Sequence, residues 1–539
     1  MNDKPLLMGK FHSLKSLFWS TFEGFFHYDG ISEKQGRRIL IGILLLVFTL
    51  RLLTIHIPAL DRTDWKEIDH IMISKNFQTN GYNLLEPTVW WPAEEPRITA
   101  VELPLVAFIS SLLYPVIGFN ALSVRLITLL AFLLLVVYMY KLVKRETSIF
   151  LALLTAFFVG LLPMFSLFRN YLFSEPLMIF LAVFSIYQFA EWVEKAKKLS
   201  LIKFLIAFSI AISLKPTVLC IGLPLLWIYF RNHQWQIRQY LLFALVMGAC
   251  LMLPALWYWH AYHLATNYID VFGVFGGQFG GHDKFQTLTM LSKPWWYATI
   301  YWNLKIFLLG EVGLACVAAG VWLAVKYRKG QLFIAYLLAI ISFFIIVAEG
   351  NWDTSYRQLT IIPPASFFLV IGMLALLSLL YTLVRVFLGL NREKLTWILA
   401  GVIFLGLFSV FPIRKKHAYP VLDKNQPMHE KQWLFAQEIR KVAKDDSKII
   451  LAGEYTIHKG GNDVSPVTYY YSGVQGWTIQ EGEWSEAAID SLKTKGADLF
   501  GAIDYTREPE LENFLKIMSA NYEVLYTNPK QELLLIRLQ

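Results

Sequence analysis

The sequence is poor in charged residues, which make up 17% of its 539 positions. Soluble domains carry roughly 25% charged residues, so an ordinary soluble globular protein is excluded. The apolar residues, 56% of the chain, fall in long blocks rather than in amphipathic stripes. Blocks of about twenty residues match the roughly 30 Å hydrocarbon core of a bilayer. The sequence therefore predicts a chain embedded in a membrane.

Cysteine is also scarce, and each of Cys220, Cys250 and Cys316 lies inside an apolar block. Buried free thiols behave as small hydrophobic groups, and no metal-binding spacing surrounds these three. The sequence also lacks a Ser/His/Asp arrangement, a two-histidine metal motif and a glycine-rich phosphate loop after a strand. These absences argue against a disulfide scaffold, a metal motif of known spacing and a nucleotide-binding domain.

The net charge of +9 does not indicate a nucleic-acid-binding protein. The basic residues lie in short loops between apolar blocks, where Lys and Arg set membrane topology. No basic stripe with interleaved aromatic residues is present. We therefore expect membrane lipids, and no nucleic acid, among the partners of this chain.

Apolar blocks long enough to span a membrane recur along most of the chain. They lie at 39–58, 120–140, 148–168, 172–192, 200–214, 217–230, 240–259, 304–325, 331–348, 359–384 and 395–413. A further apolar stretch at 103–119 is short and contains two prolines. The pattern predicts an all-α polytopic membrane protein with roughly eleven to thirteen transmembrane helices. The first block is expected to be an uncleaved signal anchor that follows a cytoplasmic segment, 1–38.

The basic loops indicate which segments face outward. Clusters of Lys and Arg lie at 141–145, 195–198, 231–238, 326–329 and 385–394. If these loops face the cytoplasm, the outer segments are 59–102, 169–175, 215–216, 260–303 and 349–357. One basic cluster, Arg414 to Lys416, disagrees with this scheme. We expect a multi-pass protein of the bacterial inner membrane, with its transmembrane domain over 39–417.

From about Ala418 onward the composition becomes that of a soluble domain. Helices are predicted at 429–445, 484–495 and 507–520, and strands at 448–452, 497–503 and twice within 522–537. Ser472–Gly473 and Gln475–Gly476 are predicted to be turns. The alternation of helices and strands predicts a small α/β domain over 418–539. The topology places this domain on the extracytoplasmic side.

The first outer loop, 59–102, holds the residues best suited to chemistry. Asp64, Glu67 and Asp69 lie in a stretch whose apolar residues have helical periodicity, and Glu102 follows just before Pro104. Carboxylates gathered where the chain re-enters lipid are costly unless they have a function. The alternative interpretation is a solvated amphipathic helix on the membrane surface.

Cationic side chains lie at three other outer positions. Arg169, Lys215 and the pair Tyr356-Arg357 each lie at the boundary of an apolar block. An arginine can hold a phosphate through two hydrogen bonds, so these positions are candidates for binding a phosphate. The alternative is that the cations only extend toward the membrane surface.

The order of several motifs resembles bacterial membrane glycosyltransferases of the GT-C class. The motifs are Trp65 to Asp69, Ile73 to Phe77, and Glu102-Leu103-Pro104-Leu105. The group they resemble includes relatives of dolichyl-phosphate-mannose protein mannosyltransferases and of the lipid A aminoarabinose transferase. The resemblance covers roughly residues 39–380, and the stretch Pro466 to Trp477 also resembles the bacterial branch. Lys66 and Glu67 depart mildly from the Arg and Gln that the bacterial branch carries.

The resemblance implies an inverting glycosyltransferase with a GT-C-like fold. Such an enzyme moves a hexosyl or pentosyl group from a polyprenyl-phosphate donor to a lipid, glycan or protein acceptor on the outer face. No cofactor is implied with certainty, and a divalent cation is compatible with the pattern. By position, the candidate catalytic residues are Asp69, Asp64 and Glu102, and the candidate substrate-binding residues are Lys66, Glu67, Arg169, Lys215, Tyr356 and Arg357.

Two other function classes stay open at this point. One is a polytopic polymerase or ligase of lipid-linked glycans, and the other is a transporter or flippase. Transporters often show internal repeats and charge near the bilayer midplane. This sequence shows no repeat of its halves, and its polar residues gather on one face, which favours the transferase.

Overall fold

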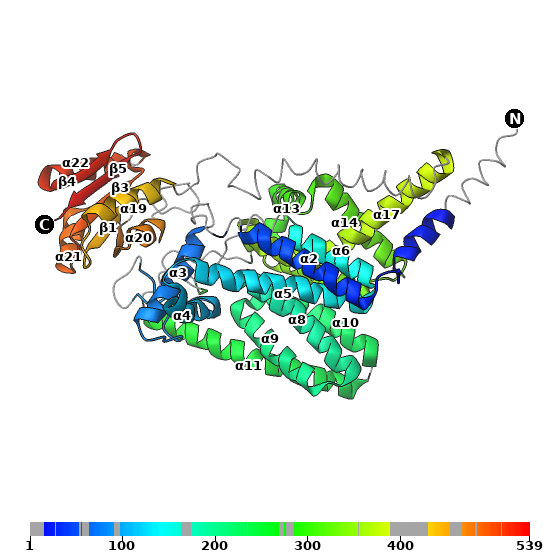
Figure 1. Ribbon diagram of the computed structural model, residues 1–539. Helices are drawn as coiled ribbons and strands as arrows, with labels where there is room; N and C mark the ends of the chain where they lie inside the picture. The colour runs from blue at the N-terminus through cyan, green and yellow to red at the C-terminus, as the bar shows by residue number, and fades with distance from the viewer. Residues whose placement is uncertain are drawn as a thin grey trace.

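Most of the described chain is helical, and its strands gather in one sheet near the C-terminus (Figure 1). The computed structural model describes residues 16–26, 28–52, 55, 64–90, 97–162, 174–233, 236–268, 274–275, 285, 287–353, 355–388, 430–452, 466–479, 482–507 and 509–538. The sheet lies at one end of the molecule, beside helices α3 and α4 (Figure 1).

The helical bundle runs from α2 to α17. Its helices are α2 (Glu33–Leu52), α3 (Asp64–Thr79), α4 (Leu105–Ile117), α5 (Leu122–Glu146), α6 (Ile149–Leu161), α8 (Ser174–Lys195), α9 (Lys198–Leu214), α10 (Gly222–His233), α11 (Ile237–Asn267), α12 (Thr287–Leu291), α13 (Pro294–Phe307), α14 (Gly310–Lys326), α15 (Gln331–Ile346), α16 (Ala348–Asp353) and α17 (Ile362–Leu388). Two 3₁₀ helices, η1 (Pro216–Ile221) and η2 (Ser355–Ile361), interrupt it.

Some of these helices have the length and composition of membrane spans. Within the described residues, α5, α8, α11 and the stretch Tyr356–Arg385 pass that test, and α13 with α14 form a further candidate span bent by 98°. Helices α4, α6 and α15 are apolar but shorter. The predicted block at 395–413 lies outside the described residues. A helical membrane protein is therefore supported, while eleven to thirteen spans stay a prediction.

Two glycines explain why α14 and α17 pack closely. A Cβ atom at Gly320 would lie 2.0 Å from the carbonyl oxygen of Phe368, and one at Gly372 would lie 1.8 Å from that of Cys316. Small residues let helix backbones approach in this way, which increases van der Waals contact where hydrophobic driving force is weak. The core of the bundle therefore depends on these two positions.

The C-terminal sheet has the strand order β2-β1-β3-β5-β4. Its strands are β1 (Lys448–Ala452), β2 (Gln475–Ile479), β3 (Leu499–Ile503), β4 (Glu523–Asn528) and β5 (Leu533–Arg537). Strand β1 pairs in parallel with β2 and β3, and β5 pairs antiparallel with β3 and β4. Alternate residues face opposite sides of a sheet, so β1 directs Ile449 and Leu451 to one core and Ile450 to the other.

Helices cover both faces of this sheet. One face packs against α19 (Glu430–Val442) and α20 (Pro466–Ser472), and the other against α21 (Glu486–Thr494) and α22 (Pro509–Asn521). The strand that the sequence predicts at 448–452 is present with the same bounds. The elements predicted at 429–445, 484–495, 497–503, 507–520 and 522–537 are present with slightly shorter bounds. The predicted α/β arrangement of the tail is therefore confirmed.

The prediction of a turn at Gln475–Gly476 is wrong, because these residues begin strand β2. A Cβ atom at position 476 would lie 1.7 Å from the carbonyl oxygen of Ile449, so the glycine permits close pairing with β1. The turn predicted at Ser472–Gly473 is present, with Gly473 at a φ of +76°. Glycine thus marks a turn at one position and a close strand contact three residues later.

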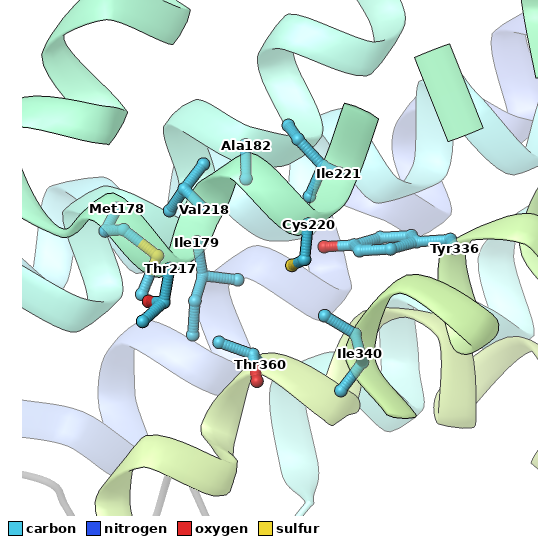
Figure 2. Close-up of a pocket in the computed structure, with 10 residues that line it drawn as sticks. All are labelled: Met178, Ile179, Ala182, Thr217, Val218, Cys220, Ile221, Tyr336, Ile340 and Thr360. Atoms are coloured by element: carbon cyan, nitrogen blue, oxygen red, sulfur yellow. The ribbon is translucent and has the colours of Figure 1, made fainter. Parts of the chain in front are cut away.

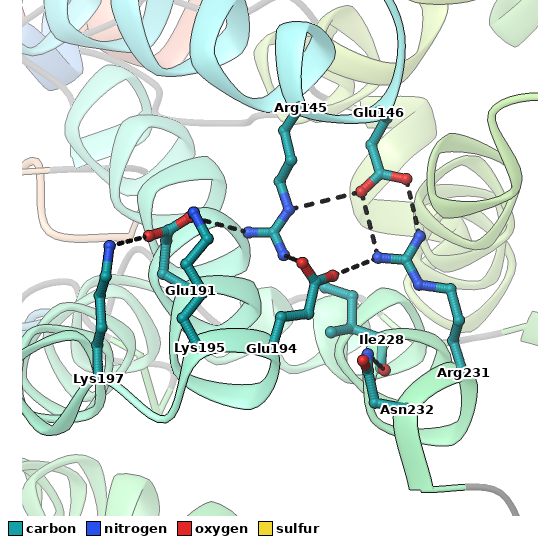
Figure 3. A network of polar contacts seen from close by, with 9 residues as sticks. All are labelled: Arg145, Glu146, Glu191, Glu194, Lys195, Lys197, Ile228, Arg231 and Asn232. Atoms are coloured by element: carbon teal, nitrogen blue, oxygen red, sulfur yellow. Dashed lines mark hydrogen bonds and ion pairs between the residues drawn. The ribbon is translucent and has the colours of Figure 1, made fainter.

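A network of ion pairs lies at the end of the bundle away from the sheet. Figure 3 shows Arg145 contacting Glu191 and Glu194, while Arg231 lies 2.9 Å from Glu146 and 2.6 Å from Glu194. These residues come from the ends of α5, α8 and α10. Three basic loops that the sequence predicts on one membrane side therefore meet at one end of the bundle.

Candidate functional site

Helix α3 is attached to the bundle by a buried ion pair between Glu67 and Arg125. Arg125 lies in the first turn of α5, and its Nε and Nη2 atoms lie 2.9 and 2.8 Å from Oε1 of Glu67. The Nη1 atom of Arg125 also donates to the carbonyl of Ile55 at 2.5 Å. Removing one partner of a buried pair typically costs about 3–5 kcal/mol, because the other charge is left uncompensated. The pair therefore fixes where α3 lies against α5.

Asp69 lies two residues further along α3 and is fully buried. Residues two apart on a helix do not face each other, so Glu67 and Asp69 leave α3 on different sides. Asp64 is the first residue of α3, and the side chains of Asp64 and Lys66 lie outside the described part of the structure. The Glu67–Arg125 pair thus orients α3, while the side chain of Asp69 leaves the helix on a side that does not face Arg125.

The loop after α3 is closed by Asn76. Its Nδ2 donates to the carbonyl of Thr88 at 2.7 Å, and its Oδ1 accepts a hydrogen bond from Nε1 of Trp90 at 2.8 Å. The next residue, Phe77, is buried against α4. This pair of contacts gives the Asn76-Phe77 motif a structural role, since it folds the loop back onto α3.

A second polar group, which we call the Lys215 cluster, forms where several helices end. It contains Glu102, Glu175, Lys215, Tyr356 and Arg357. The Nζ atom of Lys215 lies 2.8 Å from Oε1 of Glu175 and 3.3 Å from Oε1 of Glu102. It also lies 5.7 Å from the centre of the Tyr356 ring. The structure therefore brings together four residues predicted for the site, namely Glu102, Lys215, Tyr356 and Arg357, from segments far apart in sequence.

The backbone around Glu102 is held by neighbouring helices. The carbonyl of Ser213, in α9, accepts from the backbone N–H of Leu103 at 3.2 Å and from the Tyr258 hydroxyl at 3.1 Å. The indole of Trp257, in α11, donates to the carbonyl of Val101 at 3.2 Å. These contacts order the chain on both sides of Glu102 and so direct its carboxylate toward Lys215.

Lys215 lies between α9 and η1 and keeps its charge. Burial alone lowers the pKa of this lysine, but the carboxylates of Glu102 and Glu175 raise it, and the net direction is upward. The side chain of Glu175 is 1% exposed and that of Glu102 is 25% exposed. Glu175 is therefore the fixed partner of Lys215, and Glu102 is the partner with access to solvent.

Arg357 is the more available of the two cations in the cluster. Within the described residues, no carboxylate pairs with its guanidinium, which lies over the Tyr356 ring with its carbon 5.9 Å from the ring centre. A Cβ atom at Gly350 would lie 2.0 Å from Nη1 of Arg357, so the glycine leaves room for this side chain. Gln358 anchors η2 by donating to the carbonyl of Asn351 at 2.8 Å.

A small cavity lies among helices α8, η1, α15 and η2 (Figure 2). Thr217 and Thr360 in its wall lie within three residues of Lys215 and Arg357 in sequence. The cavity has a volume of about 10 Å³, which is room for one water molecule. Its full lining is Met178, Ile179, Ala182, Thr217, Val218, Cys220, Ile221, Tyr336, Ile340 and Thr360. It is too small to hold a sugar or a lipid chain in this form.

Three residues in or beside these two groups, Arg125, Glu175 and Tyr258, were not among the predicted site residues. Arg125 carries a signal that could identify it, because a charged residue inside an apolar block usually has a partner. Glu175 carries the same signal at the start of an apolar block. Tyr258 carries none, since tyrosine is common near the ends of spanning helices.

Some predicted features lie outside the described residues. Arg169, one of the candidate substrate-binding residues, is among them. Within the described part of the chain, no group of three or more His, Cys, Asp or Glu side chains is arranged to hold a metal ion. The suggestion of a divalent cation stays a prediction.

Comparison with known proteins relates this geometry to a family. Residues 97–259 match the sequence model of a family described as dolichyl-phosphate-mannose-protein mannosyltransferase. The resemblance to membrane glycosyltransferases of the GT-C class is confirmed. The matched segment includes Glu102, Arg125, Glu175 and Lys215. No curated protein matches the chain.

Solved structures share the fold over nearly the whole chain. ArnT from Cupriavidus metallidurans, bound to undecaprenyl phosphate, is 12% identical with a TM-score of 0.58, covering 94% of this chain and 98% of ArnT. The apo form of ArnT is 13% identical with a TM-score of 0.61 and the same coverage. An oligosaccharyltransferase from Archaeoglobus fulgidus in its apo form is 9% identical with a TM-score of 0.53, covering 88% and 70%. At these identities the likeness is one of fold.

Proposed function

We propose that this chain is an inverting glycosyltransferase of the bacterial inner membrane. It takes a hexosyl or pentosyl group from a polyprenyl-phosphate donor and transfers it to a lipid, glycan or protein acceptor on the outer face. The observation that carries the proposal is the Lys215 cluster, which places two cations beside carboxylates where several helices end. The fold is shared with ArnT, whose crystal structure contains undecaprenyl phosphate.

The position of the Arg145 network supports an outward-facing site. Glu175 lies in the first turn of α8 and Glu194 in its last turn. Helix α8 has 22 residues, which corresponds to about 33 Å at a rise of 1.5 Å per residue. That length matches the roughly 30 Å hydrocarbon core, and basic loops favour the cytoplasm. The Lys215 cluster then faces outward, on the same side as α3 and the C-terminal domain.

In this proposal, Arg357 and Lys215 bind the phosphate of the donor. Arg357 is open to an anion, whereas Lys215 is held by two carboxylates. An anion that approaches Lys215 is repelled by Glu102, and unit charges 4 Å apart interact by about 4 kcal/mol at an effective dielectric constant near 20. Because Glu102 is the more exposed and more distant partner, its side chain is the one that rotates away from Lys215 when the phosphate binds. Arg169 stays a further candidate for this role.

The transfer step needs one base and one stabilised leaving group. We assign Asp69 as the base, with Asp64 as the second candidate and Glu102 as the third. The carboxylate accepts the proton of the acceptor hydroxyl as its oxygen bonds to the anomeric carbon. The bond from that carbon to the phosphate oxygen breaks, and its electron pair stays on the phosphate, beside the cations. Glu67 is assigned to holding α3 rather than to binding sugar.

A deletion strain complemented with wild-type or Asp69→Asn protein tests the proposal. Mass spectrometry of envelope lipids, glycans and proteins is expected to show a mass deficit of one sugar unit in the deletion strain. Wild-type protein restores that unit and Asp69→Asn does not. A change in the length of a long glycan would indicate a polymerase or ligase. Donor lipid that accumulates on the cytoplasmic side would indicate a flippase, and either result would refute the transferase.

A further inference from the structure

Helix α20 carries three consecutive tyrosines, Tyr469 to Tyr471, between the sheet and α3. Tyr469 belongs to the C-terminal domain, because it is fully buried in the sheet core and its hydroxyl lies 3.0 Å from that of Thr478. Val467 on the same helix lies in the same core. One side of α20 is therefore fixed to the domain.

Tyr470 extends the other way, into the membrane domain. Its ring packs against a cluster formed by Ile71 of α3, Val106 of α4 and Val124 of α5. It also meets the Phe119 ring edge-on, with ring centres 6.3 Å apart. One tyrosine of the C-terminal domain thus packs against a cluster to which α3, α4 and α5 each contribute one residue.

The surroundings of Tyr470 explain what its ring contributes. The ring lies near the buried ion pair, because it packs against the cluster that contains Val124, the residue before Arg125 in α5. Burial raises the pKa of the Tyr470 hydroxyl, Tyr114 and Glu67 raise it further, and Arg125 lowers it. A large ring beside such a pair excludes water, and charge interactions are stronger in the lower dielectric that results.

The same domain contacts the acidic loop at a second place. Arg97 donates to the carbonyl of Trp90 at 3.2 Å and to the side-chain oxygen of Gln475, in β2, at 2.7 Å. Ile68 and Met72 of α3 also lie in one buried cluster with Phe435 of α19. Helix α3 is therefore held on one side by Arg125 and on the other by the C-terminal domain.

We infer that Tyr470 is a positioning residue for α3, so that the C-terminal domain completes the site rather than standing apart from it. Packing of its ring holds α3 against α5 and thereby fixes the place of Asp69. This inference rests on the proposed function for its catalytic consequence, but the structural part of it can be tested without any sugar transfer.

Three variants of the full-length protein in lipid nanodiscs test the structural part. Hydrogen exchange of the backbone amides of α3 is expected to be faster in Tyr470→Ala than in wild type. Tyr470→Phe keeps the ring and retains wild-type exchange. Tyr522→Ala is the matched control, because this tyrosine packs on the far face of the same sheet. The inference is overturned if the α3 amides of Tyr470→Ala exchange at the wild-type rate. It is also overturned if they exchange as fast in Tyr522→Ala as in Tyr470→Ala.

Kinetics test the catalytic part. A displacement of about 1 Å can cost 100-fold in rate, so we expect a kcat roughly 100-fold lower in Tyr470→Ala. The KM for donor is expected to be unchanged, because the Lys215 cluster is untouched. Tyr470→Phe rescues kcat. If Tyr470→Ala does not fold, Tyr470→Leu takes its place with the same expected direction. A rise in donor KM with constant kcat contradicts positioning.

The two measurements separate the two proposals. If wild-type protein transfers no sugar from any polyprenyl-phosphate donor, the proposed function fails. The exchange measurement on α3 still decides whether Tyr470 holds the helix. If wild type is active and Tyr470→Ala has normal kcat and normal exchange, the positioning role alone is refuted.

Discussion

At the scale of single residues, the proposed function gives chemistry to some side chains and a supporting role to others. Glu67 already has a buried partner in Arg125, so its charge is satisfied within the protein. Asp69 lies on the same helix but on a different side. A carboxylate that acts as a base needs its charge and a hydroxyl within hydrogen-bond distance. The neighbouring pair therefore makes Asp69 the clearer target for substitution.

Asp69→Asn keeps the size of the side chain and removes its basicity. We expect it to lower kcat by about 10²–10⁴-fold, the usual contribution of a general base, while donor binding persists. Turnover with a purified donor measures the first effect, and a shift of the melting temperature by undecaprenyl phosphate measures the second. Asp64→Asn is the comparison, since the motif alignment leaves Asp64 as the second candidate. If Asp64→Asn is inactive and Asp69→Asn is active, Asp64 is the base instead of Asp69. If both variants are active, the assignment of the base to this helix is refuted.

Glu102 and Glu175 flank one lysine but differ in exposure, which predicts different effects on phosphate binding. Glu102→Gln removes a negative charge that repels a phosphate, while Glu175 still pairs with Lys215. The Kd for undecaprenyl phosphate is therefore expected to fall about tenfold, which corresponds to about 1.4 kcal/mol of binding free energy. Turnover falls if this carboxylate also serves the reaction. Glu175→Gln is expected to lower the melting temperature, because it leaves a buried lysine undercompensated. Equal affinity in Glu102→Gln and wild type would contradict this account.

At the scale of helices and strands, Gly350 in α16 makes room for Arg357 on η2. An alanine in a helix is favoured over glycine by up to about 1 kcal/mol, so Gly350→Ala should not destabilise the fold. Its Cβ would overlap Nη1 of Arg357, and the flexible guanidinium is the group that moves. We expect a higher donor KM with an unchanged melting temperature. Arg357→Ala provides the reference, since both variants should raise KM in the same way.

The elements were more predictable than their contacts. Strands β1 and β3 are buried apolar runs, so their sequences identify them, whereas β2 begins with Gln475 and Gly476, which resemble a turn. The glycine serves instead to let β2 pair closely with β1. Lys215 and Glu102 are each recognisable as polar residues at helix ends. Their pairing is not, because 113 residues separate them and only the fold brings them together.

Helix α20 and its contacts could not be predicted from the sequence either. Its seven residues, PVTYYYS, have no apolar periodicity that favours a helix, and tyrosine is common in strands. Tertiary packing decides its conformation, since Tyr469 fits the sheet core and Tyr470 fits the bundle. A contact of this kind between two domains leaves no pattern in a single sequence.

At the scale of the whole molecule, the C-terminal domain and the Lys215 cluster are expected on the same, extracytoplasmic side. Asp490 is exposed on α21, so Asp490→Cys offers a reactive thiol. In intact spheroplasts it should react with a membrane-impermeant reagent as fully as after lysis. The native protein is the control, because Cys250 and Cys316 are buried and Cys220 is only partly exposed. Labelling that appears only after lysis would place the domain and the site in the cytoplasm.

The charges of the Lys215 cluster bear on how the reaction cycle ends. Glu102 and Glu175 balance Lys215 and Arg357, so the cluster has no net formal charge. In the proposed reaction, the donor is a phosphodiester with one negative charge, whereas the released carrier is a phosphate monoester with a charge of about −1.5 to −2 at pH 7. If the same two cations bind both, they would hold the spent carrier more tightly than the incoming donor. Under the proposed function, slow departure of this carrier would limit turnover, and it would show as a first cycle faster than those that follow.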